Sequence, residues 1–531
     1  MRVNNTGRRR MLATASVAVA AVLTLAACGG GGGSDTTSGG TPQTGGTLNV
    51  GMSSEVTTLD PAKGSANAMA LSGYAIYDTL MKVDKLGDTP APNIAKSFEP
   101  NDDLTVWTMK LPSGVKFSDG TDFNAEAVKY NMDRHIDPDQ ASTAASLLSS
   151  VKSVDAPDET TVVFNLKYPF ANLPAVLSYD GSGTAGYIAS PTALKKYGDD
   201  YTAHASGVGP YQVKSWAPGK DIVLERNPNY WNAGDHEAYL DQINIKLIED
   251  EQARYQALQA GDIDYAPSIN PTIIQQAESG GQLQVIHGEG SDQDSIALNV
   301  TKPPFDDLRV RQAVSYAVNR QEILDLTKEG LGEPAVNLFP ASDPYANDNS
   351  DPEYDLDKAK ALVDEYEADT GNQVEFTYMC RPTVNTTDVI ERQLTAAGMK
   401  VKVDVQESTT AVSNYIAGKY DATCWTMAGF LTPDLLPYRF FYSTGDLNSM
   451  GFDNAEFDSL VDQARQTSDE GKQKDLWIQA DKILTEELPW VWTTSQPIGF
   501  LASKKVHSID FEEPSRLRYY VPTVNNVWLS K

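Results

Sequence analysis

Cysteine and histidine are scarce in this chain of 531 residues. It holds 3 Cys and 5 His, and no two histidines have the spacing of a metal-binding pair such as HExxH. The GxSxG pattern of a nucleophile elbow and the GxxxxGK[S/T] phosphate loop are also missing. One GxGxxG match, Gly181 to Gly186, is soon followed by Pro191, so we expect a flexible loop rather than a dinucleotide site. The sequence therefore predicts no enzyme, no metal and no cofactor.

Basic residues are also few. Lys and Arg number 43 against 72 Asp and Glu, a formal charge of −29. Nucleic-acid binding rests on basic patches, so this balance argues against that class of partner. The hydrophobic content of 40%, with 24 Tyr and 8 Trp, is high enough to form a large core. The charge is typical of a well-solvated extracellular surface.

Long apolar runs are missing after residue 27. The one such run, Met11 to Ala27, follows Arg2 and Arg8-Arg9-Arg10 and ends at Cys28. Basic, apolar and then small residues are the order of a secretory signal, and the run is shorter than the roughly 20 residues that span a bilayer. Leu-Ala-Ala-Cys matches the lipobox of bacterial lipoproteins, the alternative being an ordinary signal peptide with a chance Cys. Removal of the four arginines takes the charge from −29 to −33.

The segment Gly29 to Gly46 reads GGGGGSDTTSGGTPQTGG and has nothing to bury, so it predicts a flexible tether. We therefore expect a protein anchored through lipid on Cys28 to the outer face of the cytoplasmic membrane, without crossing it. The arginine run leaves the Sec and twin-arginine export routes both open. About 485 residues follow the tether, which suggests two to four domains.

The clearest secondary-structure pattern lies between Val374 and Thr426. Strands and helices alternate there as βαβαβ, which predicts parallel strands with right-handed crossovers. Their carboxyl ends, where open α/β sheets bind ligands, are Cys380-Arg381-Pro382 and Cys424-Trp425-Thr426. Cys380 and Cys424 would lie at the same end of neighbouring strands, either as a disulfide or as two buried free thiols.

Other segments have simpler patterns. Strands are expected at 47–52, 211–213, 221–225, 243–248 and 488–493, a strand-turn-strand unit at 107–120, and two strands within 151–166. Helices are expected at 71–81, 125–135 (capped by Asn124), 306–326, 357–366, 454–466 and 472–486.

Five stretches together resemble one family. They are Gly46-Thr47-Leu48 leading to Leu59-Asp60-Pro61, WTMKLPSGVKFSDG (107–120), GVGPYQV (207–213), LERNPNYW (224–231) and KPPFDDLRVRQAVSYAVNR (302–320). In this order they resemble the large extracytoplasmic solute-binding proteins of peptide-type ABC importers, the dipeptide, oligopeptide and nickel-binding group. Beyond Arg320 the match rests on the order of elements.

The resemblance implies a monomeric, two-lobed α/β protein of the periplasmic-binding-protein type II class, with an extra domain and a hinge. The implied segments are a signal (1–28), the tether (29–46), lobe I (47–75, 190–298 and 495–531), the extra domain (76–189) and lobe II (299–494). The chain should cross between lobes near Leu298-Asn299 and near Trp492 to Ser495.

The resemblance also implies where the solute binds. The pocket should be lined by the loop after Pro61, with Ser65 and Asn67, and by the segment after the last βαβ strand. That segment supplies Trp425, Met427, Gly429 and Phe430, and Trp492 lies near the hinge. Trp425 could stack on the solute or belong to the core. Arg381-Pro382 resembles an Arg-Pro of dipeptide-type members, in which the Arg meets a ligand carboxylate; the alternative is a surface Arg.

One position departs from the family pattern. Members that hold a peptide amino terminus place an Asp two or three residues beyond the last strand, whereas here Met427-Ala428-Gly429-Phe430 has no acid before Asp434. The expected function is capture of a peptide or peptide-like solute for ABC permease subunits. Alternatives are a non-peptide solute (oligosaccharide, small metabolite or metal chelate), a sensor, or an anchored hydrolase.

Overall fold

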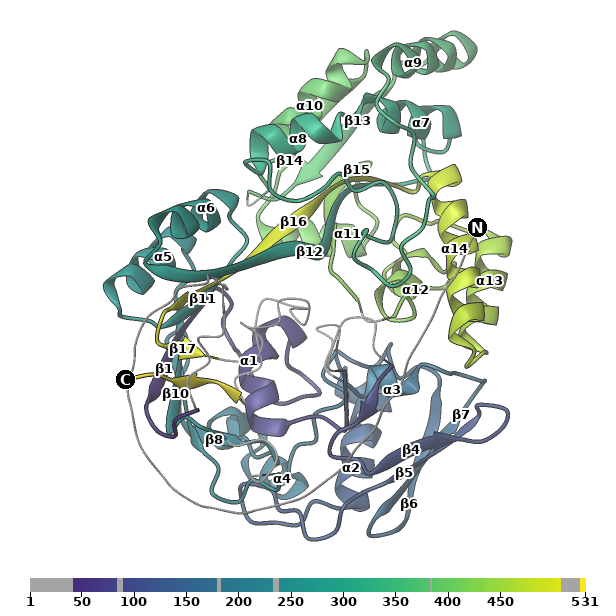
Figure 1. Ribbon diagram of the computed structural model, residues 1–531. Coiled ribbons are helices and arrows are strands. Elements are labelled where there is room, and N and C mark those ends of the chain that lie inside the picture. Colours follow the sequence, from purple (N-terminus) through teal and green to yellow (C-terminus); the bar gives the residue numbers. More distant parts are fainter. Residues whose placement is uncertain are drawn as a thin grey trace, which may run out of the picture. The chain divides into compact units, whose positions relative to one another are not determined.

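The computed structural model describes residues 42–83, 89–178, 183–232, 238–382, 384–430, 432–507 and 526–531 (Figure 1). The predicted signal, Cys28 and most of the tether lie outside these ranges. Residues Thr41–Lys531 form one compact unit. Among the described residues, no helix has both the length and the apolar character that crossing a membrane requires.

Ten strands of the described chain form one sheet. In spatial order they are β14 (Lys400–Val405), β13 (Glu375–Cys380), β15 (Ala422–Met427), β12 (Leu283–Leu298), β16 (Trp490–Ser503), β11 (Tyr265–Ser268), β1 (Thr47–Met52), β10 (Gln242–Leu247), β9 (Asp221–Arg226) and β8 (Tyr211–Ala217). The strands predicted at 47–52, 211–213, 221–225 and 243–248 are confirmed. The strand predicted at 488–493 begins at Trp490 and continues ten residues further.

The described part of the chain also forms fourteen α-helices. They are α1 (Ala66–Tyr77), α2 (Ala125–Ile136), α3 (Leu173–Val176), α4 (Pro191–Tyr197), α5 (Glu251–Ala260), α6 (Pro271–Gly280), α7 (Leu308–Ala317), α8 (Arg320–Thr327), α9 (Leu356–Thr370), α10 (Thr387–Ala396), α11 (Ser408–Ile416), α12 (Leu436–Phe441), α13 (Ala455–Arg465) and α14 (Glu470–Glu487), with 3-10 turns at Pro138–Gln140 and Gly198–His204.

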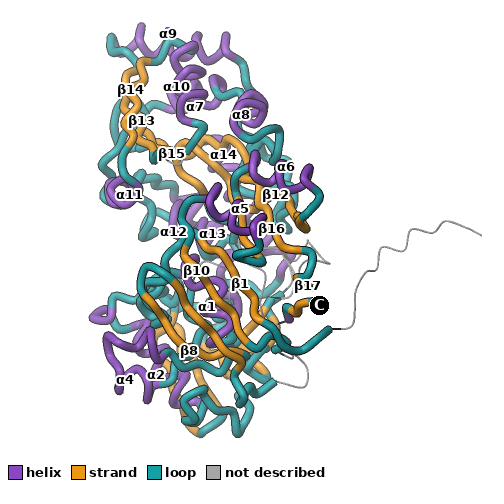
Figure 2. The backbone as a smooth tube through the Cα atoms, turned by 90° about the vertical axis from the view of Figure 1, so that its left-hand side faces the viewer, coloured by secondary structure: helices purple, strands orange, loops and turns teal. Residues whose placement is uncertain are grey.

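The strands β12 and β16 connect the two halves of the sheet and lie side by side in Figures 1 and 2. The first part of β12 pairs with β16 beside β11, and its last part pairs with both β16 and β15. Between these parts the register shifts from Glu289 to Gln293 and again to Ser295. Such irregularities bend a strand pair and increase its twist. The sequence predicted that the chain first crosses between lobes near Leu298-Asn299. The register break lies a few residues earlier, and β12 already pairs with β15 from Gln293 onward.

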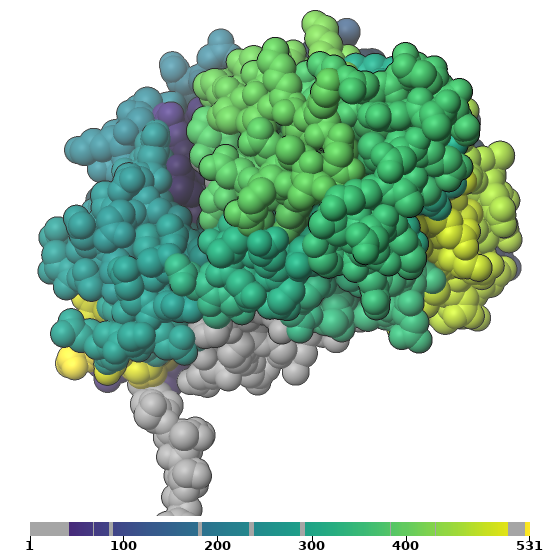
Figure 3. Space-filling model, turned by 90° about the horizontal axis from the view of Figure 1, so that it is seen from above, coloured from purple at the N-terminus to yellow at the C-terminus, as the bar shows by residue number. Residues whose placement is uncertain are grey.

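The predicted βαβαβ unit is confirmed. Strand β13 is parallel to both β14 and β15, and α10 and α11 supply the crossovers. Side chains alternate between the two faces of this part of the sheet, and each face belongs to a different apolar cluster. One cluster contains Cys380, Cys424 and Ile296, and the other contains Met379, Met427 and Ala297. Seen from above (Figure 3), the teal and green segments from β12 to β15 form much of the visible face.

The single helix predicted over 306–326 is wrong, because the chain forms α7 and α8 instead. Val318 has an extended backbone, and the side chain of Asn319 accepts the N–H of Glu322 as the cap of α8. An Asn competes well as a helix cap, and the apolar period alone does not reveal the break.

A second sheet forms the extra domain, in the order β4 (Ser97–Pro100), β5 (Val106–Lys110), β7 (Thr161–Leu166) and β6 (Val151–Asp158). Helix α2 packs on it and begins after Asn124, whose side chain accepts the N–H of Ala127 as predicted. The unit predicted at 107–120 contains only β5, and an isolated bridge joins Lys116 to Asp122. Two antiparallel sheets of two strands each complete the described strands: β2 (Met81–Lys82) with β3 (Ala91–Pro92), and β17 (Val506–His507) with β18 (Trp528–Leu529).

His135 on α2 should make the stability depend on pH. Its ring is buried, its Nδ1 lies 2.7 Å from the hydroxyl of Ser142, and burial, with Arg134 nearby, lowers its pKa from 6.5 to about 4. Between pH 6.5 and 4, His135 is therefore largely protonated in the unfolded chain and largely neutral in the folded chain. We expect the free energy of unfolding to fall by up to about 3 kcal/mol between pH 6.5 and 4 from this group.

Urea titrations at several pH values measure this effect. The His135→Gln variant should lose that part of the pH dependence, whereas substitution of the exposed His204 by Gln should retain it. Equal pH profiles for the wild type and His135→Gln would contradict the assignment.

Candidate functional site

The carboxyl ends of β13 and β15 bring Arg381 and Trp425 together. The guanidinium carbon of Arg381 lies 5.7 Å from the centroid of the Trp425 ring. The same ring stacks on Tyr415 at 3.9 Å and meets the edge of Phe440 at 6.1 Å. Trp425 remains half-buried, so it belongs to the edge of the core and still presents surface. The core interpretation holds in part, and stacking of Trp425 on a solute stays a prediction.

Arg381 differs from the other arginines near it. Its side chain makes no hydrogen bond or ion pair with any described residue, and its Nε is buried without a partner. By contrast, Arg320 pairs with buried Asp351 at 3.3 Å and Arg465 with buried Asp434 at 3.3 Å. The positive charge available at this end of the sheet is therefore that of Arg381.

Three predicted pocket residues are buried. Met427, Phe430 and Trp492 expose 1%, 5% and 1% of their surface and lie in one apolar cluster with Tyr415 and Phe440. Trp492 packs against Trp490 with ring centroids 5.5 Å apart. Contact of these side chains with a solute remains a prediction.

The loop before α1 is fixed from the extra domain. Asp60 accepts two hydrogen bonds from the guanidinium of Arg134, at 2.9 and 2.6 Å, and both side chains are largely buried. Thr143 donates its N–H to Ala62 and its hydroxyl to the carbonyl of Gly64, each at 3.0 Å. The loop is thereby anchored on both sides of its turn.

The end of this loop leads into α1. A Cβ on Gly64 would lie 2.1 Å from the sulfur of Met69, so a larger residue there would have to displace the buried Met69 side chain. Ser65 is exposed at the start of α1, and the side chain of Asn67 lies outside the description.

Acidic side chains lie beside the predicted acid-free segment, and sequence reasoning missed them. Asp292 on β12 accepts the N–H of Gly429 at 2.8 Å. Asp294 accepts the hydroxyl of Thr426 at 2.8 Å, because β12 and β15 pair antiparallel. More than 130 residues separate these partners, and a local pattern cannot report such a pairing.

Asp294 also connects this segment to the strand break. It accepts hydrogen bonds from Lys328 Nζ at 2.8 Å and from Gln496 Nε2 at 2.9 Å. The Lys328 and Asp294 side chains are 7% and 12% exposed, so the pair is largely shielded from water. The carboxylate of Asp294 thus connects β15, the end of α8 and the irregular part of β16. We call Asp294, Lys328, Thr426 and Gln496 the hinge cluster.

Asp434, the next acid along the chain, is occupied elsewhere. Burial raises its pKa although Arg465 lies beside it. Asn172 of the extra domain donates to the same carboxylate, and the N–H of Ala171 donates to the carbonyl of Arg465 at 3.0 Å. Arg465 also lies 3.8 Å from the ring centroid of Tyr438 and 4.9 Å from that of Phe170. Asp434 therefore binds the extra domain to the segment after β15.

Cys380 and Cys424 are both free and buried, so the disulfide that the sequence allowed is not formed in the structure. They lie on neighbouring strands as predicted.

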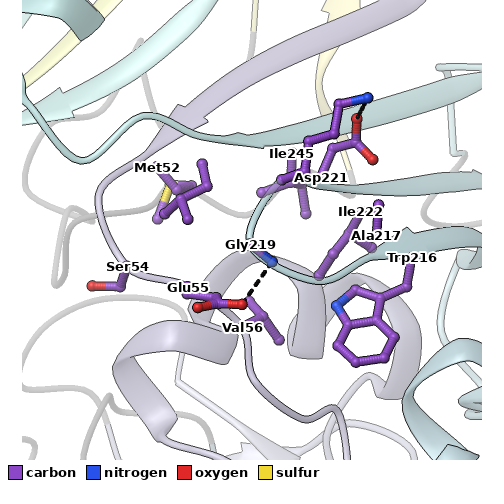
Figure 4. Close-up of a pocket in the computed structure, with 12 residues that line it drawn as sticks. Met52, Ser54, Glu55, Val56, Trp216, Ala217, Gly219, Asp221, Ile222 and Ile245 are labelled. Atoms are coloured by element: carbon purple, nitrogen blue, oxygen red, sulfur yellow. Dashed lines mark hydrogen bonds and ion pairs between the residues drawn. The ribbon is translucent and has the colours of Figure 1, made fainter.

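Two cavities lie away from Arg381 and Trp425. Figure 4 shows one of about 20 Å³, lined by Met52, Glu55 and Trp216 among others, where Glu55 accepts the N–H of Gly219 at 2.7 Å. It has room for about one water molecule. The other, of about 330 Å³, lies between α2 and α4 and is lined by Glu126, Tyr130 and Lys195 among others. Neither includes a residue predicted to bind solute.

Within the described ranges, no group of three or more His, Cys, Asp or Glu has the arrangement of a metal site. Of the Gly181 to Gly186 stretch, Gly181 and Ser182 lie outside the description. At Gly186, a Cβ would lie 2.2 Å from the carbonyl oxygen of Leu177, so this glycine packs against backbone.

Comparison with known proteins gives two kinds of similarity. The glutathione-binding protein GsiB of Shigella flexneri is 28% identical over 463 residues, which cover 83% of this chain and 87% of that one. Among solved structures, the ABC transporter-associated periplasmic binding protein DppA from Helicobacter pylori, in complex with the peptide STSA, has a TM-score of 0.78 at 24% identity and covers 92% and 99% of the two chains. AgaA from A. tumefaciens R10, in complex with agropinic acid, has a TM-score of 0.76 at 24% identity, with the same coverage.

The structural matches establish the two-lobed α/β fold that the sequence predicted. In addition, residues 89–448 match the model of the bacterial extracellular solute-binding proteins, family 5 Middle. The matched range includes both Arg381 and Trp425. The chain therefore belongs to the family 5 extracellular solute-binding proteins of bacteria.

Proposed function

We propose that this protein is the solute-binding component of an ABC importer and that it captures a small peptide-like solute with a free carboxylate. The two lobes close around the solute, and the closed protein delivers the solute to the permease subunits. The signal and lipobox of the sequence support attachment through lipid on Cys28 at the outer face of the cytoplasmic membrane. The likeness to a glutathione-binding protein and to a peptide-bound transporter component supports this class of solute.

The unpaired guanidinium of Arg381 is the observation that carries the proposal. A guanidinium can donate two parallel hydrogen bonds to a carboxylate, and a partly buried cation without a partner is costly unless a ligand provides one. Arg381 stands at the carboxyl end of a parallel strand, where open α/β sheets bind their ligands. Trp425 beside it offers an aromatic surface for an apolar part of the same solute.

The other residues of the proposed site have supporting roles. Ser65 and Asn67 contribute polar groups from the start of α1, which the Asp60–Arg134 pair holds in place. Gly429 supplies backbone between Met427 and Phe430. Trp492, buried behind them, keeps the segment rigid through its contact with Trp490.

We also assign the lobes as the sequence suggested, with 47–75, 190–298 and 495–531 in lobe I, 76–189 in the extra domain and 299–494 in lobe II. Three apolar clusters support the division in outline. At its borders Ile296 and Leu298 pack in the cluster of lobe II, and Leu435 packs in that of the extra domain. The register break in the β12–β16 pair is where bending between lobes costs least, because the ladder is already interrupted there.

A second candidate solute is an opine-like metabolite. Family members that hold a peptide amino terminus place an Asp two or three residues beyond the last strand, whereas Met427 to Phe430 has no acid. The binder of agropinic acid is also nearly as similar in fold as the peptide binder. Such a metabolite also carries carboxylate, so Arg381 would serve it equally well. The two candidates differ in the part of the solute that faces Met427 to Phe430.

Arg381 variants test the proposal through calorimetric titration with glutathione, a dipeptide panel and the same dipeptides amidated at the carboxyl end. Arg381→Met should weaken binding of the free-carboxylate solutes by roughly 10- to 100-fold, the effect of losing a charge-assisted hydrogen bond. Arg381→Lys should recover part of the loss. The melting temperature should change little, because the contact of Arg381 with a described residue that is lost is the one with the Trp425 ring.

The control variant is Arg392→Met, whose side chain pairs with Glu322 on the surface and should leave binding unchanged. Equal affinity of the wild type and Arg381→Met for every solute that binds would refute the role of Arg381. Preference for amidated peptides would refute the carboxylate.

The hinge cluster gives a second prediction. Asp294→Asn or Lys328→Leu alone leaves one largely buried charge unpaired and should lower the free energy of unfolding by about 3–5 kcal/mol. The double variant should lose less than the sum of the two, since it leaves no lone charge. Urea denaturation measures all three, with Asp122→Asn in the exposed Lys116–Asp122 pair as a control that changes little. Strict additivity would show that the pair is not coupled.

A further inference from the structure

Two free thiols lie directly behind the proposed solute contacts. Met379 is opposite Thr423 in the parallel β13–β15 pair, so the next residues in register are Cys380 and Cys424. Neighbouring strands are about 4.8 Å apart, which is within the Cα separations that a disulfide spans. Both cysteines belong to the apolar cluster between the sheet and α7, α9 and α10.

The two thiols are not equivalent. Burial by itself raises the pKa of Cys380, but hydrogen bonds from Cys424, Thr387 and Tyr378 outweigh it and the net shift is downward. The hydrogen bond to Cys380, together with burial, raises the pKa of Cys424. A thiol with a lowered pKa beside a second thiol is the arrangement in which disulfide exchange closes a ring.

The pair is directly joined to the solute-binding residues. Cys380 immediately precedes Arg381, and Cys424 immediately precedes Trp425. Because side chains alternate along a strand, the sulfurs point to one face of the sheet and the solute contacts to the other. Any change in the separation of the two sulfurs therefore moves the two strand ends from which Arg381 and Trp425 emerge.

We propose that Cys380 and Cys424 form a thiol–disulfide switch whose closure stiffens these strand ends and weakens the hold of Arg381 and Trp425 on the solute. The expected change in solute affinity rests on the function proposed above, whereas formation of the Cys380–Cys424 disulfide does not depend on it. A protein outside the cytoplasm meets small disulfides, which serve as the oxidant.

The exchange balances in two steps. The Cys380 thiolate attacks one sulfur of a small disulfide R–S–S–R, which forms a mixed disulfide and releases RS⁻. Cys424 then gives its proton to solvent, and its thiolate attacks the Cys380 sulfur and expels the second RS⁻. Both cysteines are oxidised to one disulfide, and the oxidant is reduced to two thiols. The dithiol packs in the core without this bond, so the reduced state is a complete fold.

The test uses the full-length protein in detergent, incubated with bis(2-hydroxyethyl) disulfide or with reduced dithiothreitol. Peptide mass spectrometry should find the peptides that contain Cys380 and Cys424 joined, with the loss of two hydrogens. Hydrogen exchange without added solute should become slower at 380–382 and 424–427 in the oxidised form. Dithiothreitol should restore the original rates.

Cys424→Ser is the matched variant. It should form only a mixed disulfide at Cys380 and should not show the slower exchange. Two thiols that stay reduced, or a disulfide that leaves exchange at both strand ends unchanged, would overturn the switch.

Glutathione is unsuitable for this affinity measurement because its thiol reduces disulfides. The dipeptide panel is therefore titrated into the oxidised and the reduced protein. Weaker binding by the oxidised form is the expected result, and equal binding would overturn the coupling to solute. Failure of every solute to bind either form would count against the proposed function, and the exchange rates would still decide whether the switch exists.

Discussion

The antiparallel pairing of β12 with β16 is the constraint on which the rest of the structure depends. These strands connect the part of the sheet around β1 to the part around β15, and the chain enters and leaves residues 299–489 through them. The contact of Asp434 and Arg465 with the extra domain is a second link between the two sides. The β12–β16 ladder is interrupted from Glu289 to Ser295, where Asp294 gathers Lys328, Thr426 and Gln496. The strand pair can bend at this interruption while the regular parts of the ladder on either side keep their register. The shielded Lys328–Asp294 ion pair holds the interrupted part in place.

Charge pairing then distinguishes the binding site from the rest of the protein. Asp60 with Arg134, Asp351 with Arg320 and Asp434 with Arg465 are buried pairs in which each charge has its partner inside the protein. They fix the loop before α1, the start of α8 and the contact of the extra domain. Arg381 has no such partner among the described residues. An unpaired guanidinium at a strand end is suited to an anionic group, and this supports the site proposed around Arg381.

The sequence predicted the parts of the fold in which local pattern and tertiary structure agree. The βαβαβ unit was predicted because its strands and helices have clear periods, and the cap at Asn124 was predicted from residue type. The helix over 306–326 was wrong because Asn319 starts a new helix inside an unbroken apolar pattern. The surroundings of Met427 to Phe430 were misjudged for another reason. Asp292 and Asp294 reach this segment through strand pairing, which one sequence does not reveal.

The most direct test of the central claim is mass spectrometry of the solute that is released when the protein, purified from a rich medium, is denatured. The account predicts a small solute with at least one free carboxylate, either a peptide mixture or a single opine-like metabolite. A peptide mixture would mean that some residue other than an Asp after Trp425 holds the amino end of the peptide. A neutral oligosaccharide, or any solute without a carboxylate, would contradict the role given to Arg381 and with it the proposed site.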